Sequence, residues 1–257
     1  MSEFPRNIRP QDMGRATSKV FSGRTESETT RKMYAETPTF FAEKIRNLLD
    51  AREPYVFADV GAASGEMMTN LRKLLPEYSL KVIAVDIDAG SLDRNIADEK
   101  LVANAEELPF ESVDVIVMRY VLQWNNLERQ KKILNELTRS IRKFALVEHI
   151  GADSNDSDEW RKYIDELFRG KDVPQLKRED YFLSSSAEIE KWMSEQGIRF
   201  ERLRERRIDD AANAFIERWK LDERDAVETR RILGEKNYLQ QTDWIIFPKK
   251  RTEQVCL

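Results

Sequence analysis

Short apolar runs alternate with amphipathic segments along the first 150 residues of the chain. The runs are rich in β-branched residues, which is typical of strands buried on both faces. Between them apolar residues recur every three or four positions, as Ile133, Leu134 and Leu137 do, and this spacing predicts helices. We predict strands at 56–60, 80–85, 101–103, 113–118 and 144–150.

The regular alternation of strands and helices favours parallel pairing, because each helix carries the chain back to the start of the next strand. Two further strands are predicted at 198–208 and 244–247. The predicted fold class is α/β: a doubly wound, mostly parallel seven-stranded sheet with helices on both faces and a helical cap. We predict helices at 38–50, 66–75, 91–97, 127–141, 159–168, 187–196, 209–219 and 223–233.

Residues 1 to about 30 are polar and lack helical or strand periodicity, so we predict an N-terminal arm or lid at 1–37. Thr37 is the expected cap of the first helix, and Pro38 its first residue. Residues 38–257 form the predicted domain, with a cap insertion at about 152–183 and a helical insertion at about 209–235.

Composition limits the classes of function. The chain has 257 residues, 40% of them hydrophobic, and a net charge of -4, which gives no general attraction to nucleic acid or anionic membranes. No apolar stretch approaches the roughly 18 residues of a membrane helix. Cys256 is the only cysteine, so the chain cannot form an internal disulfide or a thiolate metal cluster. We expect a cytoplasmic protein without a metal, and composition does not define its oligomeric state.

The first candidate binding motif closes the predicted strand at 56–60. Small residues after a strand let the backbone approach a ligand closely, and the following helix offers free N–H groups. An ordinary strand-to-helix turn has similar residues, and so does a nicotinamide or flavin site, although the glycine spacing here departs from that fingerprint. The motif reads Asp59-Val60-Gly61-Ala62-Ala63-Ser64-Gly65.

Two further polar positions follow the next strands. Asp86 ends the second strand, where a carboxylate can bind both ribose hydroxyls of an adenosine; its alternative role is a cap, for which Asp88 is better placed. Asn104 follows the third strand, where its amide can accept from an adenine amino group while the Ala105 N–H donates to a ring nitrogen. Asn104 can also be a plain turn residue.

In this order the motifs resemble those of the class I S-adenosylmethionine-dependent methyltransferases, in the branch with a Leu-Pro-Phe segment, here Leu108-Pro109-Phe110. That branch holds ubiquinone/menaquinone C-methyltransferases and many small-molecule methyltransferases. The resemblance covers about residues 41–150. It implies S-adenosylmethionine as the cofactor and methyl transfer to a small-molecule carboxylate, hydroxyl or amine by in-line displacement.

The resemblance also implies a set of cofactor-binding residues. The first turn would hold the methionine moiety, the end of the second strand would bind the ribose and lie against the adenine, and the segment after the third strand would read the adenine edge. The fourth strand would end beside the methionine. The implied residues are Asp59, Gly61, Ala62, Ala63, Gly65, Asp86, Ile87, Asn104, Ala105, Glu106 and Arg119. The family pattern has a glycine in place of Ala63 and an aspartate in place of Asn104.

The segment after the fourth strand, Leu122-Gln123-Trp124, is distantly similar to that of trans-aconitate and malonyl-acyl-carrier-protein methyltransferases, which esterify carboxylates. Gln123 and Trp124 are therefore candidate substrate contacts, as is Tyr163 in the predicted cap. The alternative is that these aromatic residues pack in the core or hold the cap on the sheet.

Two residues are candidates for catalysis. His149 follows Glu148 near the end of the fifth strand, where an imidazole can act as general base if the acceptor keeps a proton; a hydrogen-bonded structural histidine is the alternative. Tyr34 lies in the predicted arm, from which it could close over the methyl group.

Five arginines between Arg199 and Arg207 indicate either a solvated strand of ion pairs or a patch for an anion such as RNA. The alternatives to a small-molecule enzyme are therefore an RNA or protein methyltransferase, which needs an open basic face here, and a non-catalytic protein that keeps the fold and binds a partner.

Overall fold

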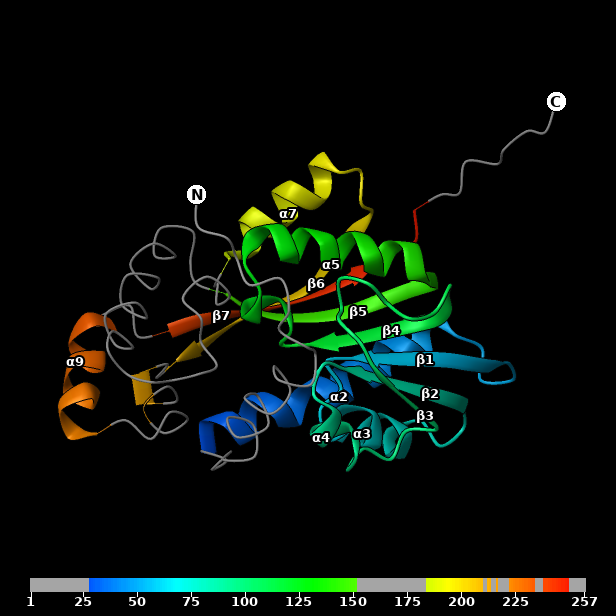
Figure 1. Cartoon of the computed structure of the whole chain (residues 1–257), viewed down its shortest axis with the longest axis horizontal. Coiled ribbons are helices and arrows are strands. Elements are labelled where there is room, and N and C mark those ends of the chain that lie inside the picture. The colour runs from blue at the N-terminus through cyan, green and yellow to red at the C-terminus, as the bar shows by residue number, and fades with distance from the viewer. Residues whose placement is uncertain are drawn as a thin grey trace, which may run out of the picture.

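The computed structural model describes residues 28–151, 184–209, 212–213, 216, 222–233 and 238–249. Within these residues the strands form one seven-stranded sheet of order β3-β2-β1-β4-β5-β7-β6 (Figure 1). The first five strands are parallel and β7 is antiparallel to both of its neighbours, so the predicted fold class is confirmed. The strands are β1 Pro54–Val60, β2 Ser79–Asp86, β3 Glu99–Val102, β4 Val113–Arg119, β5 Ile141–Gly151, β6 Phe200–Asp209 and β7 Tyr238–Ile246.

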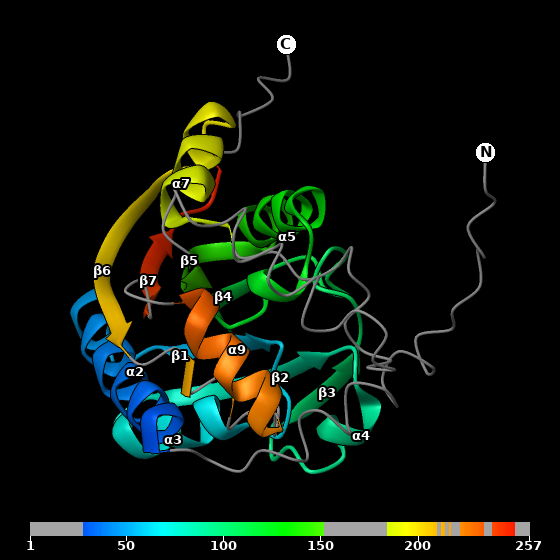
Figure 2. The same ribbon diagram turned by 90° about the vertical axis from the view of Figure 1, so that its left-hand side faces the viewer.

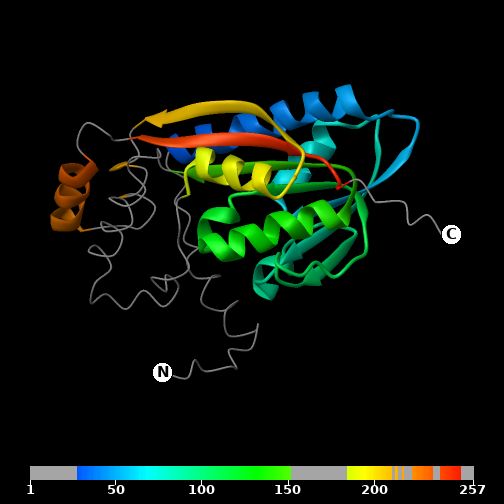
Figure 3. The same ribbon diagram turned by 90° about the horizontal axis from the view of Figure 1, so that it is seen from above.

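Helices cover both faces of the sheet (Figures 1 and 3). Helices α5 and α7 pack on one face, and α2 and α3 pack on the other. The short α4 follows β2, and α9 lies beyond the carboxyl ends of the parallel strands. The helices are α2 Glu28–Leu48, α3 Glu66–Leu74, α4 Ala89–Leu92, the 3₁₀ turn η1 Leu122–Trp124, α5 Leu127–Ser140, α7 Ser186–Glu195 and α9 Glu223–Leu233.

The core consists of two apolar layers that the central strands share. Val115 and Val117 of β4 pack with α2 and α3, whereas Ile116 and Met118 pack with α5 and α7, and all four are fully buried. This alternation explains why β4 is a continuous apolar run in the sequence.

The predicted start of the first helix is wrong. Helix α2 begins at Glu28 and not at Pro38, so Pro38 lies inside it and residues 28–37 are helical. Thr37 does not cap the helix, because its hydroxyl donates to Glu148 on β5. A proline inside a helix costs about 3 kcal/mol, which the burial of Phe41, Ile45 and other α2 residues against the sheet can offset.

The predicted cap at 152–183 and most of the predicted helix at 209–219 lie outside the described residues. The division into an arm and a domain with two insertions stays a prediction. Among the described helices, none combines the length and the apolar character that spanning a bilayer requires.

Parallel register brings the carboxyl ends of the central strands to one edge of the sheet. Val60 of β1 pairs with Val85 of β2 on one side and Met118 of β4 on the other, and Asp86 pairs with Val102 of β3. Figure 2 looks onto this carboxyl edge. Ligands of open α/β sheets bind at such an edge, where the strand order reverses on either side of β1.

Candidate functional site

The turn between β1 and α3 is fastened to the end of β2. The N–H groups of Gly61 and Ala62 donate to Val85 O at 2.8 and 3.1 Å, and the Ala63 N–H donates to Asp86 Oδ2 at 2.8 Å. Gly61, Ala63 and Gly65 all have left-handed backbones, with φ of 74°, 43° and 81°. A Cβ on Gly61 would lie 2.3 Å from Val121 Cγ2, so glycine is the residue that fits there.

Ala63 explains why the family pattern has a glycine at this position. Its φ of 43° costs a residue with a Cβ roughly 1–2 kcal/mol. Asn95 helps to hold this backbone, since its Nδ2 donates to Ala63 O at 3.1 Å. Nothing in the sequence pattern pointed to Asn95.

Asp86 lies at the end of β2 and organises two loops. Its Oδ2 accepts from Ala63 N–H, and its Oδ1 accepts from Asp88 N–H at 2.9 Å. Each oxygen keeps one lone pair, so a diol could still donate to the carboxylate. Burial raises the pKa of Asp86, while these two backbone donors lower it. Asp88 caps α4 by accepting from Gly90 N–H, as expected.

Asp59 is a buried carboxylate next to the turn. Burial raises its pKa to about 7, the Arg119 guanidinium opposes this rise, and the charge of Asp86 adds to it. Its Oδ2 has no hydrogen-bond partner within the described structure. A ligand ammonium would supply both the missing donor and the missing charge.

The segment after β3 uses its side chains locally. Asn104 Oδ1 accepts from the Glu106 N–H at 3.1 Å, and Asn104 Nδ2 donates to Glu106 Oε1 at 3.2 Å. Glu106 is further paired with Arg129 of α5. Asn104, Ala105 and Ile87 are partly exposed, so these groups stay accessible at the carboxyl edge.

The end of β4 holds Arg119, as the sequence predicted. Tyr120 follows with a left-handed φ of 58°, a strained conformation for a bulky residue, and its hydroxyl accepts from Gln241 Nε2 at 3.0 Å. Gln123 is buried, and its Oε1 has no hydrogen-bond partner among the described residues. Trp124 is partly exposed.

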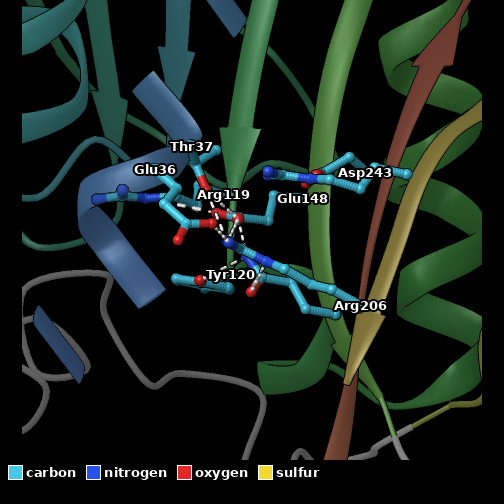
Figure 4. Close-up of polar contacts among 9 residues, drawn as sticks. Glu36, Thr37, Arg119, Tyr120, Glu148, Arg206 and Asp243 are labelled. Atoms are coloured by element: carbon cyan, nitrogen blue, oxygen red, sulfur yellow. Dashed lines mark hydrogen bonds and ion pairs between the residues drawn. The ribbon is translucent and has the colours of Figure 1, made fainter. Parts of the chain in front are cut away.

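A buried polar cluster beside Arg119 was missed by sequence reasoning (Figure 4). Glu148 of β5 is fully buried, and its Oε1 accepts from Thr37 Oγ1 at 2.5 Å and from Gln241 Nε2. Arg206 of β6 reaches the same carboxylate at 3.5 Å, and Arg119 reaches it at 3.9 Å. The available signal was a charged residue within the apolar run of β5.

His149 lies on the opposite face of the sheet from Glu148. It is fully buried, stacks on Trp244 with ring centroids 5.8 Å apart, and Nε2 contacts Ser184 O at 2.9 Å. Burial lowers the pKa of His149 to about 4. This arrangement favours a structural role for His149. Its role as a general base stays a prediction.

The other two aromatic candidates cannot be placed as side chains. Tyr34 belongs to helix α2 rather than to an arm, and its side chain lies outside the described part of the structure. Tyr163 also lies outside the described residues.

The arginines of β6 divide between the two faces of the sheet. Arg202 pairs with Glu190 of α7 at 2.6 Å, whereas Arg204 pairs with Asp243 at 2.7 Å and Arg206 pairs with Glu36 of α2 at 2.5 Å. Of the two interpretations of these arginines, the pairs match a solvated strand of ion pairs. In the described structure the arginines do not form one open basic face.

Comparison with known proteins agrees with this geometry. Residues 58–146 match the family described as a methyltransferase domain. No curated protein matches the sequence. Solved structures do resemble the fold. The YcgJ protein of Bacillus subtilis is 14% identical with a TM-score of 0.64, covering 84% of this chain and 100% of its own.

Two other structures show how widely the fold is used. The mycolic acid cyclopropane synthase CmaA1, complexed with S-adenosylhomocysteine (SAH) and CTAB, is 13% identical with a TM-score of 0.58, covering 91% of this chain and 95% of its own. The 4+2 cyclase SpnF is 11% identical with a TM-score of 0.61, covering 96% and 99%. At these identities the structures show the fold alone, and the family match is confined to residues 58–146.

The fold and the match at residues 58–146 are those of an S-adenosylmethionine-dependent methyltransferase. Its cofactor is S-adenosylmethionine. The residues present fit this group, because the carboxyl edge combines a glycine turn that admits close approach, the unpartnered Oδ2 of Asp59 and the remaining lone pairs of Asp86.

The structural role of His149 gives a testable pH dependence. In the unfolded chain a histidine takes up a proton below about pH 6.5, but folded His149 does so only near pH 4. Its contribution to the free energy of unfolding is therefore present above pH 6.5 and is lost as the pH falls toward 4.

His149→Gln removes the titrating group and keeps a donor for Ser184 O. We expect the difference in free energy of unfolding between wild type and His149→Gln, measured by urea denaturation, to shrink as the pH falls from about 6.5 toward 4. A difference that does not change with pH would contradict the buried neutral imidazole.

Proposed function

We propose that this methyltransferase binds its donor at the carboxyl edge of β1, β2 and β4 and methylates a small-molecule carboxylate, hydroxyl or amine. The observation that carries the donor site is the position of two acidic residues near the carboxyl ends of neighbouring strands, Asp59 and Asp86, on either side of one glycine turn. One of them has a buried oxygen without a partner in the described structure.

Each residue has a separate role in the proposal. Asp59 binds the methionine ammonium, Asp86 binds the ribose hydroxyls, and Asn104 with Ala105 contacts the adenine edge. The positive charge of Arg119 opposes the rise in the pKa of Asp59 and so favours its ionised form. Gln123, whose buried Oε1 has no hydrogen-bond partner among the described residues, is a candidate acceptor contact, with Trp124 and Tyr163 as further candidates.

When bound, S-adenosylmethionine supplies a methyl group activated by a sulfonium cation. The protein's task is then to hold the acceptor in line with that methyl group and to exclude water, which can account for about 7 kcal/mol or more of the barrier. A carboxylate acceptor needs no base, whereas an amine or phenol that keeps a proton needs one. His149 remains the candidate for such a base, and Tyr34 remains the candidate for closing over the methyl group.

The charge distribution supports a small acceptor over RNA. The net charge is -4, and Arg202, Arg204 and Arg206 of β6 are each paired with a carboxylate. A macromolecular anion would need unpaired cations on one face to replace its counterions.

Two ligands that differ only in the methionine moiety separate the roles of the two aspartates. SAH carries the ammonium, and 5′-methylthioadenosine does not. We expect Asp59→Asn to weaken SAH roughly 10- to 100-fold, the value of a charge-assisted hydrogen bond, and to leave 5′-methylthioadenosine nearly unchanged. Asp86→Asn should weaken both ligands, because both contain the ribose. Calorimetric titration of wild type and both variants measures all six dissociation constants; equal losses of both ligands in Asp59→Asn would refute the assignment.

The acceptor class can be tested without knowing the acceptor. The protein is incubated with donor labelled in the methyl group and with the separated low-mass, RNA and protein fractions of a cell extract. We expect label to enter the low-mass fraction, with Asp86→Asn as the matched inactive control. Label confined to the RNA or protein fraction would replace the proposed acceptor class.

A further inference from the structure

Glu148 is a buried carboxylate that side chains from four structural elements reach (Figure 4). Thr37 of α2 donates to its Oε1 at 2.5 Å, and Gln241 of β7 donates to the same oxygen. Arg206 of β6 lies 3.5 Å from Oε1, and Arg119 of β4 lies 3.9 Å from Oε2. Glu148 thus connects helix α2, which covers this face of the sheet, with the carboxyl end of β4 beside Asp59.

The contacts around Glu148 also fix its neighbours to one another. Arg206 donates to Thr37 Oγ1 at 3.2 Å and to Gln241 Oε1 at 2.8 Å, and it pairs with Glu36. Gln241 also donates to the hydroxyl of Tyr120, whose left-handed backbone directly follows Arg119. The cluster therefore holds both the middle of α2 and the strained end of β4.

Charges face Glu148 from every element that packs against it. The cations are Arg119, Arg204 and Arg206; the anions are Glu36, Asp243 and the more distant Asp59; and Tyr120 contributes a phenol. Burial raises the pKa of Glu148 to about 7, Asp243 adds to the rise, and the two nearest arginines oppose it. Burial also raises the pKa of Asp243, and Arg204 opposes that rise.

We propose that Glu148 is a positioning residue of the donor site: as an anion it holds Arg119 and the middle of helix α2 in place, and through them it sets how tightly S-adenosylmethionine binds. The inference rests on the proposed donor site, because Arg119 acts there on Asp59. Glu148 has no exposed surface, so it works through its neighbours and not by contact with the cofactor.

The direction of the pH effect follows from the ion pairs. A neutral Glu148 no longer attracts Arg119 and Arg206, and it accepts hydrogen bonds from Thr37 and Gln241 less strongly. The anionic form is therefore the tighter-binding one, and affinity falls as the pH drops through about 7. Asp59 titrates in the same range and acts in the same direction, so the wild-type profile alone does not separate the two.

The ratio of dissociation constants between Glu148→Gln and wild type isolates Glu148, because Asp59 is common to both. Glutamine has the shape of the neutral acid. We expect Glu148→Gln to bind SAH about tenfold more weakly than wild type at pH near 8.5, and within about twofold of wild type near pH 5.5, where both carry a neutral side chain. Calorimetry gives the constants, and circular dichroism at each pH confirms the fold.

Glu190→Gln is the matched control, since Glu190 pairs with Arg202 on the opposite face of the sheet. Its ratio to wild type should stay near one at both pH values. Thr37→Val keeps the Glu148 charge and removes only the donor from α2, so we expect weaker SAH binding at pH near 8.5; this variant decides the matter if Glu148→Gln does not fold.

The outcomes separate the inference from the donor site on which it rests. A Glu148→Gln ratio that is the same at both pH values overturns the positioning role and leaves the donor site intact. Unchanged binding in Thr37→Val, where Glu148→Gln cannot be measured, does the same. If wild type binds no SAH at millimolar concentration, the donor site and the inference both fail.

Discussion

The parallel pairing of β1 with β2 on one side and β4 on the other determines where the polar side chains of this protein meet. Each of these strands is buried on both faces, so the first position at which a charged group can face a ligand is the carboxyl end. Asp59, Asp86 and Arg119 all lie at this boundary. The glycine turn follows from the same constraint, because its N–H groups must bond to the end of β2 while its backbone stays close to the space beyond the edge.

Burial then controls the chemistry of these groups. Asp59 and Glu148 lie on either side of Arg119, and each has a pKa raised to about 7 by loss of solvent. Each also has one oxygen without a hydrogen-bond partner in the described structure. A buried carboxylate destabilises the fold unless it is paired with a cation or a hydrogen-bond donor. These two carboxylates therefore favour a site that binds cations and hydrogen-bond donors. In the proposed donor site, the cofactor would bring an ammonium and a sulfonium to this edge.

Local patterns predicted the sheet, the turn and the ends of the strands, because apolar runs and small residues act over a few positions. They did not predict the Glu148 cluster, since Thr37 and Glu148 are 111 residues apart and Gln241 and Glu148 are 93 apart. The first helix was misplaced for the same reason: Thr37 looks like a cap in the sequence, but its hydroxyl is used by β5. The resemblance to the methyltransferases indicated a glycine at the position of Ala63, and the left-handed φ there gives the physical reason.

The proposed donor site lies at the carboxyl edge of β1, β2 and β4. Amide hydrogen exchange, with and without saturating SAH, tests this claim residue by residue. We expect added protection at 59–65, 86–88 and 104–106, with no change on the opposite face around Glu190 and Arg202. If SAH adds protection elsewhere and leaves these three segments unchanged, the cofactor does not bind at this edge.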